Sequence, residues 1–196
     1  MNKGLLVFLS IIGFMFFIGI FFTDSYNGIV RLDEQVRQSW SQVENVYQRR
    51  LDLIPNLVET VKGYAAHEKE TFIAVTEARS KAAGAISPDI INNPQKFQAF
   101  QESQTALSSA LSRLLVVVEK YPDLKANENF LSLQTQLEGT ENRITVERGR
   151  FNEAAQMFNT KIRQFPTNIL ASAFRFSSKE YFKADTEAKV APKVKF

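Results

Sequence analysis

The sequence predicts an all-α protein, an antiparallel up-and-down helical bundle of three long helices that follows an N-terminal transmembrane helix. Three observations support this prediction. A long uncharged segment opens the chain, three later stretches repeat apolar residues every three or four positions, and the period-two alternation of strands never persists. The short connections favour antiparallel neighbours. We expect an anchor at residues 1–23, a bundle at 24–171 and a basic, aromatic tail at 172–196.

The N-terminal segment has the length and composition of a membrane span. Residues 4–22 carry no charge, and Ser10 is their one polar side chain. About nineteen residues span ~28 Å as a helix, close to the thickness of a bilayer's hydrocarbon core. A cleaved signal peptide is the alternative, but its apolar region is shorter and ends at a small-residue cleavage site. We therefore expect a single-pass anchor. Lys3 before it and Arg31 and Arg37 after it leave its orientation open.

The first amphipathic stretch, residues 27–84, is longer than the others. Its weak points are Pro55 and Gly63, because an interior proline removes a helical hydrogen bond at a cost of ~3 kcal/mol. We predict either a rod kinked at Pro55 or a break near Gly63 that supplies a fourth helix. A lone helix would expose the apolar stripe to water, so we expect packing within the chain or coiled-coil-like self-association. The stripe comprises Ile29, Val36, Trp40, Val43, Tyr47, Leu51, Ile54, Val58, Val61, Ala65, Phe72 and Val75.

Two more helices follow, each with recognisable ends. The second is predicted from Pro94, with Asn93 as its cap, to Tyr121, and the third from near Asn127 to just before Pro166. Their apolar positions are Phe97, Phe100, Gln104, Leu107, Leu111, Leu114, Val118 and Tyr121 in the second helix, and Phe130, Leu133, Leu137, Ile144, Phe151, Ala155, Phe158, Ile162 and Phe165 in the third.

Composition argues against most kinds of chemistry. The chain has no cysteine, which excludes disulfides, thiolate metal sites and cysteine nucleophiles, and its single histidine, His67, excludes a multi-histidine metal site. It also lacks a glycine-rich phosphate loop and a nucleophile elbow. The net charge is +3 and the basic excess falls in the tail, whereas a nucleic-acid-binding domain is more often basic within its fold. We expect no enzyme, no cofactor and no nucleic acid, with His67 at the surface or in a cap.

A polar stripe runs beside the apolar stripe of the first helix. It consists of Arg49, Asp52, Asn56 and Glu59, while Glu141, Arg148 and Asn152 have helical spacing on the third helix. If the two helices are neighbours, these side chains could meet in a polar layer at the edge of the core. Three interpretations remain open: register-setting ion pairs, a surface for a partner protein or second subunit, and a small-molecule or metal site.

The tail, residues 172–196, mixes aromatic and basic side chains. That mixture suits an anionic membrane surface or a groove on a partner. The alternative is that residues 172–182 pack on the bundle.

Several stretches together resemble a known family. They are Tyr26-Asn27, Trp40, Arg50 to Tyr64, His67-Glu68, Ala78-Arg79, Tyr121 to Ala126, Phe130 to Gln134, Leu137 to Ile144, Arg148 to Asn152 and Phe165-Pro166. With them, and most specifically with the D-L-I-P-N-L-V run, the chain resembles the LemA family of bacterial membrane-anchored proteins. The resemblance implies a single anchor in the bacterial cell membrane, a helical bundle and no catalytic residues. Some members are encoded near membrane proteases, which implies a protease as one kind of neighbour.

The expected function is therefore a membrane-anchored bundle that acts through protein–protein contacts, as a scaffold, an adaptor or an oligomeric assembly. Its expected partners are the membrane, through residues 4–22, and either further copies of itself or other membrane proteins. The alternative is a membrane-associated binding module that holds a small ligand in the polar layer.

Overall fold

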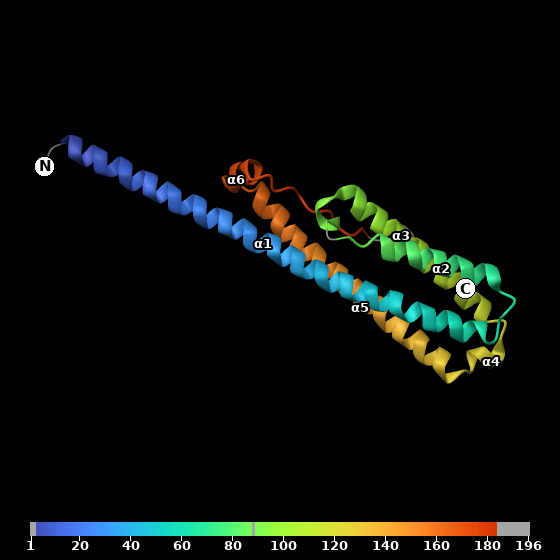
Figure 1. The fold of residues 1–196 in the computed structure, drawn as a ribbon. Helices are drawn as coiled ribbons and strands as arrows, with labels where there is room; N and C mark the ends of the chain where they lie inside the picture. The colour runs from blue at the N-terminus through green and yellow to red at the C-terminus, as the bar shows by residue number, and fades with distance from the viewer. Residues whose placement is uncertain (1–2, 88, 184–196) are drawn as a thin grey trace, which may run out of the picture.

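The computed structural model describes residues 3–87 and 89–183, and these residues form helices without any strand (Figure 1). The prediction of an all-α protein is confirmed. The helices are α1, Lys3–Lys62; α2, Lys69–Gly84; the 3-10 helix η1, Ile90–Asn92; α3, Pro94–Val118; α4, Pro122–Lys125; α5, Glu128–Arg163; and α6, Thr167–Ala173.

Helix α1 joins the N-terminal apolar segment, residues 4–22, directly to the rest of the protein. It is one continuous helix of 60 residues. Its N-terminal part projects alone beyond the other helices in Figure 1, and its large apolar side chains are exposed there. By length and composition, α1 is the one helix in the described part of the chain that can cross a membrane.

The break predicted near Gly63 is present. Helix α1 ends at Lys62 and α2 begins at Lys69, so the long amphipathic stretch supplies two helices. Pro55 lies inside α1 with an exposed side chain, and the helix continues through it. A kink at Pro55 stays a prediction.

A cation from α2 compensates for the missing amide of Pro55. In an unbroken helix the N–H of residue 55 would donate to the carbonyl of Leu51, four residues back. That carbonyl instead accepts a hydrogen bond of 2.8 Å from Arg79 Nε. The proline is thus tolerated because a side chain of the neighbouring helix satisfies the carbonyl that it leaves free.

The core consists of two clusters along the length of the bundle. Helix α1 packs along α5, and α2 packs along α3 (Figure 1). The proximal core, on the side of the apolar segment, is rich in aromatic residues; the distal core is mainly aliphatic. Trp40 is 3% exposed and its ring centroid lies 5.4 Å from that of Phe100 and 5.5 Å from that of Phe151. Packing within the chain therefore covers the apolar stripe of α1.

Asparagine caps define the starts of α3 and α5, and the sequence predicted the cap at Asn93 and the start of the third helix near Asn127. Asn93 accepts a hydrogen bond of 3.0 Å from the backbone N–H of Lys96, with Pro94 in the first turn. Asn127 accepts one of 3.0 Å from the backbone N–H of Phe130. Each cap satisfies one of the amides that a helix start leaves unpaired.

The chain after α6 returns along α5 without helical structure, held by two asparagine side chains. Asn152 donates to the carbonyl of Phe182 at 2.9 Å and accepts from the amide of Phe182 at 2.8 Å. Asn159 binds both main-chain groups of Lys179 in the same way, at 2.9 and 2.8 Å. Asn152 and Asn159 are seven helical residues apart, a rise of ~10.5 Å. Lys179 and Phe182 are three extended residues apart, a reach of ~10 Å, so the two spacings match.

This pairing places Phe182 inside the proximal core, where it is 6% exposed. The structure therefore shows the alternative in which residues 172–182 pack on the bundle. The rest of the predicted tail, residues 184–196, lies outside the described residues.

Candidate binding cleft

A polar cleft of about 620 Å³ opens between α1, α3 and α5. It lies where the two cores meet: Tyr47 and Ile144 on its surface belong to the proximal core, while Leu51 and Leu107, next to its lining residues, belong to the distal core. Small and polar side chains of α3 face it where larger apolar ones would fill the space. They are Gln101, Gln104, Thr105, Ser108, Ser109 and Ser112.

The hydroxyl groups of this α3 wall offer acceptors to the cleft. Ser108 Oγ donates to the carbonyl of Gln104 at 3.1 Å, Thr105 Oγ1 to that of Gln101 at 3.0 Å, and Ser112 Oγ to that of Ser108 at 3.0 Å. A hydroxyl has one hydrogen to donate and two lone pairs. Since the hydrogens are already used, these hydroxyl groups present acceptor oxygens to the cleft.

Arg50 is the buried cation of the cleft. Its side chain is 3% exposed, and its Nε lies 2.9 Å from Glu141 Oε1, in an ion pair without good hydrogen-bond geometry. Its Nη2 donates to Ser108 Oγ at 2.6 Å. Burial lowers the pKa of the Arg50 guanidinium, and the charge of Glu141 partly opposes that shift. Arg50 therefore links α1 to both α3 and α5 through polar contacts.

Gln104 adds two polar atoms without a hydrogen-bond partner to the wall of the cleft. The residue is 5% exposed, and neither its amide nitrogen nor its amide oxygen has a hydrogen-bond partner. An unpaired buried amide costs roughly 1–3 kcal/mol. Gln104 occupies an apolar position of the α3 pattern, so this cost results from a polar residue at a place where the fold alone would favour leucine.

Arg148 and the C-terminal segment form one edge of the cleft. Arg148 Nη2 donates to the carbonyl of Lys183 at 2.8 Å, and its guanidinium carbon lies 4.8 Å from the ring centroid of Phe182. Arg148, Phe182 and Lys183 all line the cleft. The cations Arg148 and Lys183 therefore add positive charge beside the Arg50–Glu141 pair.

The polar stripe predicted on the first helix is in the wrong place for a layer between α1 and α5. Asp52 accepts a hydrogen bond from Gln48 at 2.8 Å and Glu59 pairs with Lys62 at 2.7 Å, both within α1. All four stripe residues, Arg49, Asp52, Asn56 and Glu59, are exposed. The phase of α1 buries Tyr47, Arg50 and Ile54 instead. A contact between the stripe and a partner stays a prediction.

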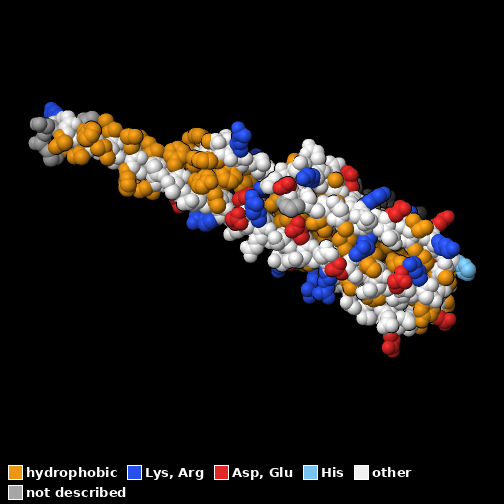
Figure 2. Space-filling view, in the orientation of Figure 1, with side chains coloured by type: hydrophobic (Ala, Val, Ile, Leu, Met, Phe, Trp, Pro, Cys, Tyr) orange, Lys and Arg blue, Asp and Glu red, His pale blue; other side chains and the backbone are white. Residues whose placement is uncertain are grey.

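Of the residues predicted on the third helix, Glu141 and Arg148 line the cleft, whereas Asn152 holds the C-terminal segment. Arg50 and Gln104 were missed as site residues. The sequence does contain a signal for each, because each is a polar residue at a position where the helical periodicity places apolar ones. His67, the single histidine, is exposed in the turn between α1 and α2, at the end of the molecule farthest from the apolar segment (Figure 2).

A second buried cation, Lys179, lies outside the cleft and is fully surrounded by partners. Its Nζ is 2.8 Å from Asp33 Oδ1, donates to Asn92 Oδ1 and lies 5.0 Å from the ring centroid of Phe158. Burial alone would raise the pKa of Asp33, but hydrogen bonds and charges from Lys179 and Arg37 outweigh it and lower that pKa. This centre fixes α1, η1, α5 and the C-terminal segment together.

Comparison with known proteins identifies relatives of this chain by sequence. The chain is 29% identical over 174 residues to magnetosome protein MamQ 2 of Paramagnetospirillum magneticum, and 28% identical over 174 residues to MamQ of Magnetospirillum gryphiswaldense. Each match covers 80% of this chain and 64% of the relative, so the chain spans just under two thirds of the length of these proteins. It is 27% identical over 184 residues to protein LemA of Metamycoplasma hominis, covering 92% of this chain and 80% of that protein.

The family model that matches, described as the LemA family, covers residues 39–196. That range includes every residue named above as lining the cleft, and the apolar segment at residues 4–22 lies before it. A match over most of the chain shows the family, and the resemblance found in the sequence motifs is confirmed. This chain belongs to the LemA family.

Proposed function

We propose that this protein is anchored in the bacterial cell membrane by one span, residues 4–22, and acts there as an adaptor that binds a segment of a partner protein in the cleft. Family membership and the long apolar helix are compatible with a bacterial membrane location. Because α1 continues from the apolar segment into the bundle, the cleft would be held at a fixed distance from the bilayer.

The observation that carries the proposal is the unpaired amide of Gln104 in an open, polar cleft. A side-chain amide offers one acceptor and two donor hydrogens, which match the C=O and N–H of a peptide group. In this protein Asn152 and Asn159 already use their amides in this way, each binding a main-chain N–H and C=O. We infer that Gln104 does the same for an extended segment supplied by a partner, once its amide, which is buried in the free protein, turns toward the cleft.

The bundle architecture that this proposal assumes is the antiparallel up-and-down order of the long helices. The contacts of α1 with α5 support it, because Arg50 meets Glu141 whereas Tyr64, in the turn just after α1, meets Asn127, the residue before α5. The reversal of the chain at Gly63 supports it for α1 and α2. A bundle of this order presents the open space between α3 and the α1–α5 pair to a partner.

We propose a binding role without catalysis. Among the described residues that line the cleft, none is histidine, cysteine or aspartate. Its one carboxylate, Glu141, is paired with Arg50. This side-chain set suits recognition by hydrogen bonds and charge more than general acid–base chemistry.

A photo-crosslinking amino acid tests the proposal in native membranes. We expect a crosslinker at Thr105, in the cleft, to capture a defined segment of one protein, and the Gln104→Leu substitution to abolish that capture. The same crosslinker at Thr135, also exposed but on α5 outside the cleft, is the matched control. Capture of a second copy of this chain would identify the partner segment as its own and the assembly as oligomeric. Equal yields at both positions, or yields unaffected by Gln104→Leu, would contradict the proposal.

A small polar molecule is the second candidate occupant. The cleft volume, about 620 Å³, lies within the range of roughly 300–1,000 Å³ that is usual for small-molecule sites. Native mass spectrometry of the purified chain distinguishes the two occupants. A retained small mass that is lost in the Gln104→Leu variant favours the small molecule over the peptide segment.

A further inference from the structure

We infer that the end of the bundle nearest to the apolar segment lies on the membrane and binds anionic lipid headgroups through α6 and its flanking residues, 163–175. We call this region the α6 edge. The inference rests on the proposed anchoring by residues 4–22 but does not depend on what the cleft binds. It concerns a surface on which large apolar side chains remain exposed in the described part of the chain.

The α6 edge lies close to the point where α1 would leave the hydrocarbon. Helix α6 packs against α1, and the ring centroids of Tyr26 and Phe174 are 4.8 Å apart. Tyr26 follows the last residue of the apolar segment, Phe22, by four residues, which is ~6 Å along a helix. The headgroup layer is roughly 5–7 Å thick on each side of the hydrocarbon. The Tyr26–Phe174 pair is therefore placed within the headgroup layer.

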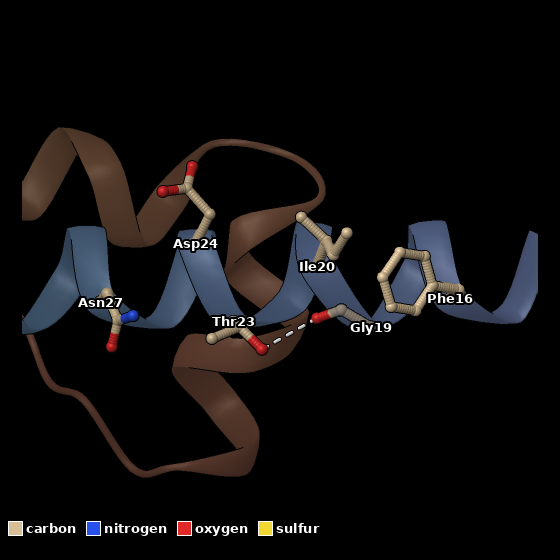
Figure 3. A pocket seen from close by; sticks show the side chains of 6 residues that line it. All are labelled: Phe16, Gly19, Ile20, Thr23, Asp24 and Asn27. Atoms are coloured by element: carbon tan, nitrogen blue, oxygen red, sulfur yellow. Dashed lines mark hydrogen bonds between the residues drawn. The ribbon is translucent and has the colours of Figure 1, made fainter.

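The side chains of α1 mark the same boundary. Figure 3 shows Phe16 and Ile20 on α1, followed within two turns by Thr23, Asp24 and Asn27, with the C-terminal part of the chain beside them. The apolar side chains suit acyl chains, and the polar ones suit water and headgroups. The change from one to the other takes place level with the start of the bundle.

The α6 edge exposes large apolar side chains at this level. Phe165 is 81% exposed, Phe174 57% and Ile169 55%. Figure 2 shows the apolar surface of the N-terminal helix continuing onto this end of the bundle. Aromatic residues are favoured at the membrane interface, where an apolar ring next to headgroups is removed from water. A bilayer surface would thus cover the side chains that the bundle leaves bare.

Cations at the α6 edge give the surface its lipid preference. Arg163 and Arg175 are exposed, and Lys161 is half-buried with its Cε next to Gly28 of α1. Asp24 is an exposed carboxylate at the same level of α1. Arg163 and Arg175 in the edge, together with Lys161 and Arg31 beside it, outnumber the carboxylate of Asp24. This excess favours anionic over zwitterionic headgroups, because basic side chains at the surface are attracted to anionic lipid.

Single-cysteine labelling tests the inference on the full chain, which has no native cysteine. An environment-sensitive fluorophore is attached at Phe165→Cys or Ile169→Cys, and the protein is placed in phosphatidylcholine vesicles with or without phosphatidylglycerol. Lipids that carry a nitroxide near the headgroup serve as quenchers for the labels on the bundle. Lipids that carry it deep in the acyl chain serve for a label at residue 12, which would lie ~15 Å inside the boundary at Phe22. Val146→Cys, an exposed apolar position on α5, is the matched control, and Ile12→Cys in the apolar segment reports on the anchoring itself.

We expect strong quenching of the labels at 165 and 169 in the vesicles with phosphatidylglycerol, and little at 146. The paired substitutions Arg163→Gln and Arg175→Gln should reduce the quenching at 169 to its level in phosphatidylcholine, whereas Arg143→Gln, also exposed on α5, should not. Quenching at 12 but not at 165 and 169 would overturn the inference and leave the anchoring intact. Absence of quenching at 12 would overturn the anchoring as well. If the labels at 165 and 169 were shielded from water but not quenched by lipid, a protein would cover the α6 edge. That result would overturn the inference that this edge binds lipid.

Discussion

The bundle contains two buried cations, and their surroundings differ. Lys179 has Asp33, Asn92 and the ring of Phe158 around it, and the C-terminal segment that carries it closes the centre. Arg50 is equally buried, but its carboxylate partner Glu141 has a side chain that is 47% exposed, and the amide of Gln104 beside the same cleft is unpaired. The first centre is complete within the chain, whereas the second remains open.

This difference supports the proposal that one polar centre serves stability and the other serves binding. A buried charge is tolerated when its hydrogen bonds and counter-charges are complete, and an incomplete set costs free energy. The Lys179 centre meets that condition and joins four parts of the chain. The Arg50–Gln104 centre does not, and the protein retains it beside an open cleft of about 620 Å³. We therefore interpret the first as structural and the second as the recognition site.

The largest expected effect comes from removing the Lys179 charge. Lys179→Met leaves the carboxylate of Asp33, whose side chain is 12% exposed, without its buried partner. We expect the free energy of unfolding to fall by about 3 kcal/mol, as for other broken buried pairs. Urea denaturation of the detergent-solubilised chain measures this, followed by the fluorescence of Trp40, the single tryptophan, which lies in the proximal core.

Arg37→Gln is the matched control, because Arg37 pairs with the same carboxylate but its side chain is 53% exposed. Exposed pairs contribute roughly 0–1 kcal/mol, so the loss should be smaller. Equal losses for the two variants would mean that burial of Lys179 is not what makes its centre structural.

A smaller loss of stability is expected from substitution of Arg79. Its hydrogen bond to the carbonyl of Leu51 matters because Pro55 has no amide hydrogen to donate there. Arg79→Met removes the donor to the carbonyl of Leu51 and should cost about 1–2 kcal/mol. In a Pro55→Ala background the restored amide can take that carbonyl, so the same substitution should cost less. A double-mutant cycle in urea measures the coupling. A coupling of zero would show that Arg79 does not act through the position of Pro55.

Low pH should weaken the ion pair between Asp33 and Lys179. The folded-state pKa of Asp33 is lowered, so its ion pair contributes stability above the unfolded value of about 3.9 and loses it as the pH falls through the folded pKa. The free energy of unfolding of the Asp33→Asn variant should be lower than that of the parent near neutral pH, and the two curves should converge below roughly pH 4. If the free energies of unfolding of the two proteins differed by the same amount from neutral pH down to below roughly pH 4, the assignment of Asp33 as the acid-sensitive group would be contradicted.

Much of the fold was predictable from local signals. The caps at Asn93 and Asn127 and the break at Gly63 are determined by neighbouring residues, and the apolar stripes by helical periodicity. The polar stripe was misplaced because the choice between Arg49 and Arg50 depends on which side of α1 faces the cleft. Burial of an arginine at an apolar phase is unfavourable unless partners from α3 and α5 meet it, and such partners are not visible in a local pattern.

The role of the C-terminal segment was also hard to predict. It follows α5 through main-chain hydrogen bonds to Asn152 and Asn159, which produce no periodicity in its own sequence. Lys179 and Phe182 were therefore assigned to a basic, aromatic tail, although both are buried. The structure shows the alternative that the sequence left open, in which residues 172–182 pack on the bundle.

The stability of the Gln104→Leu variant tests the central claim, that the cleft is kept polar for binding at a cost to the fold. Leucine matches the apolar phase of α3 and removes two unpaired polar atoms. We expect the free energy of unfolding to rise by about 1 kcal/mol, the lower end of the penalty for a buried unpaired amide. Gln101→Leu, at a half-buried position of the same wall, should leave it nearly unchanged. A fall in the stability of Gln104→Leu would show that the amide serves the fold, and would contradict the claim.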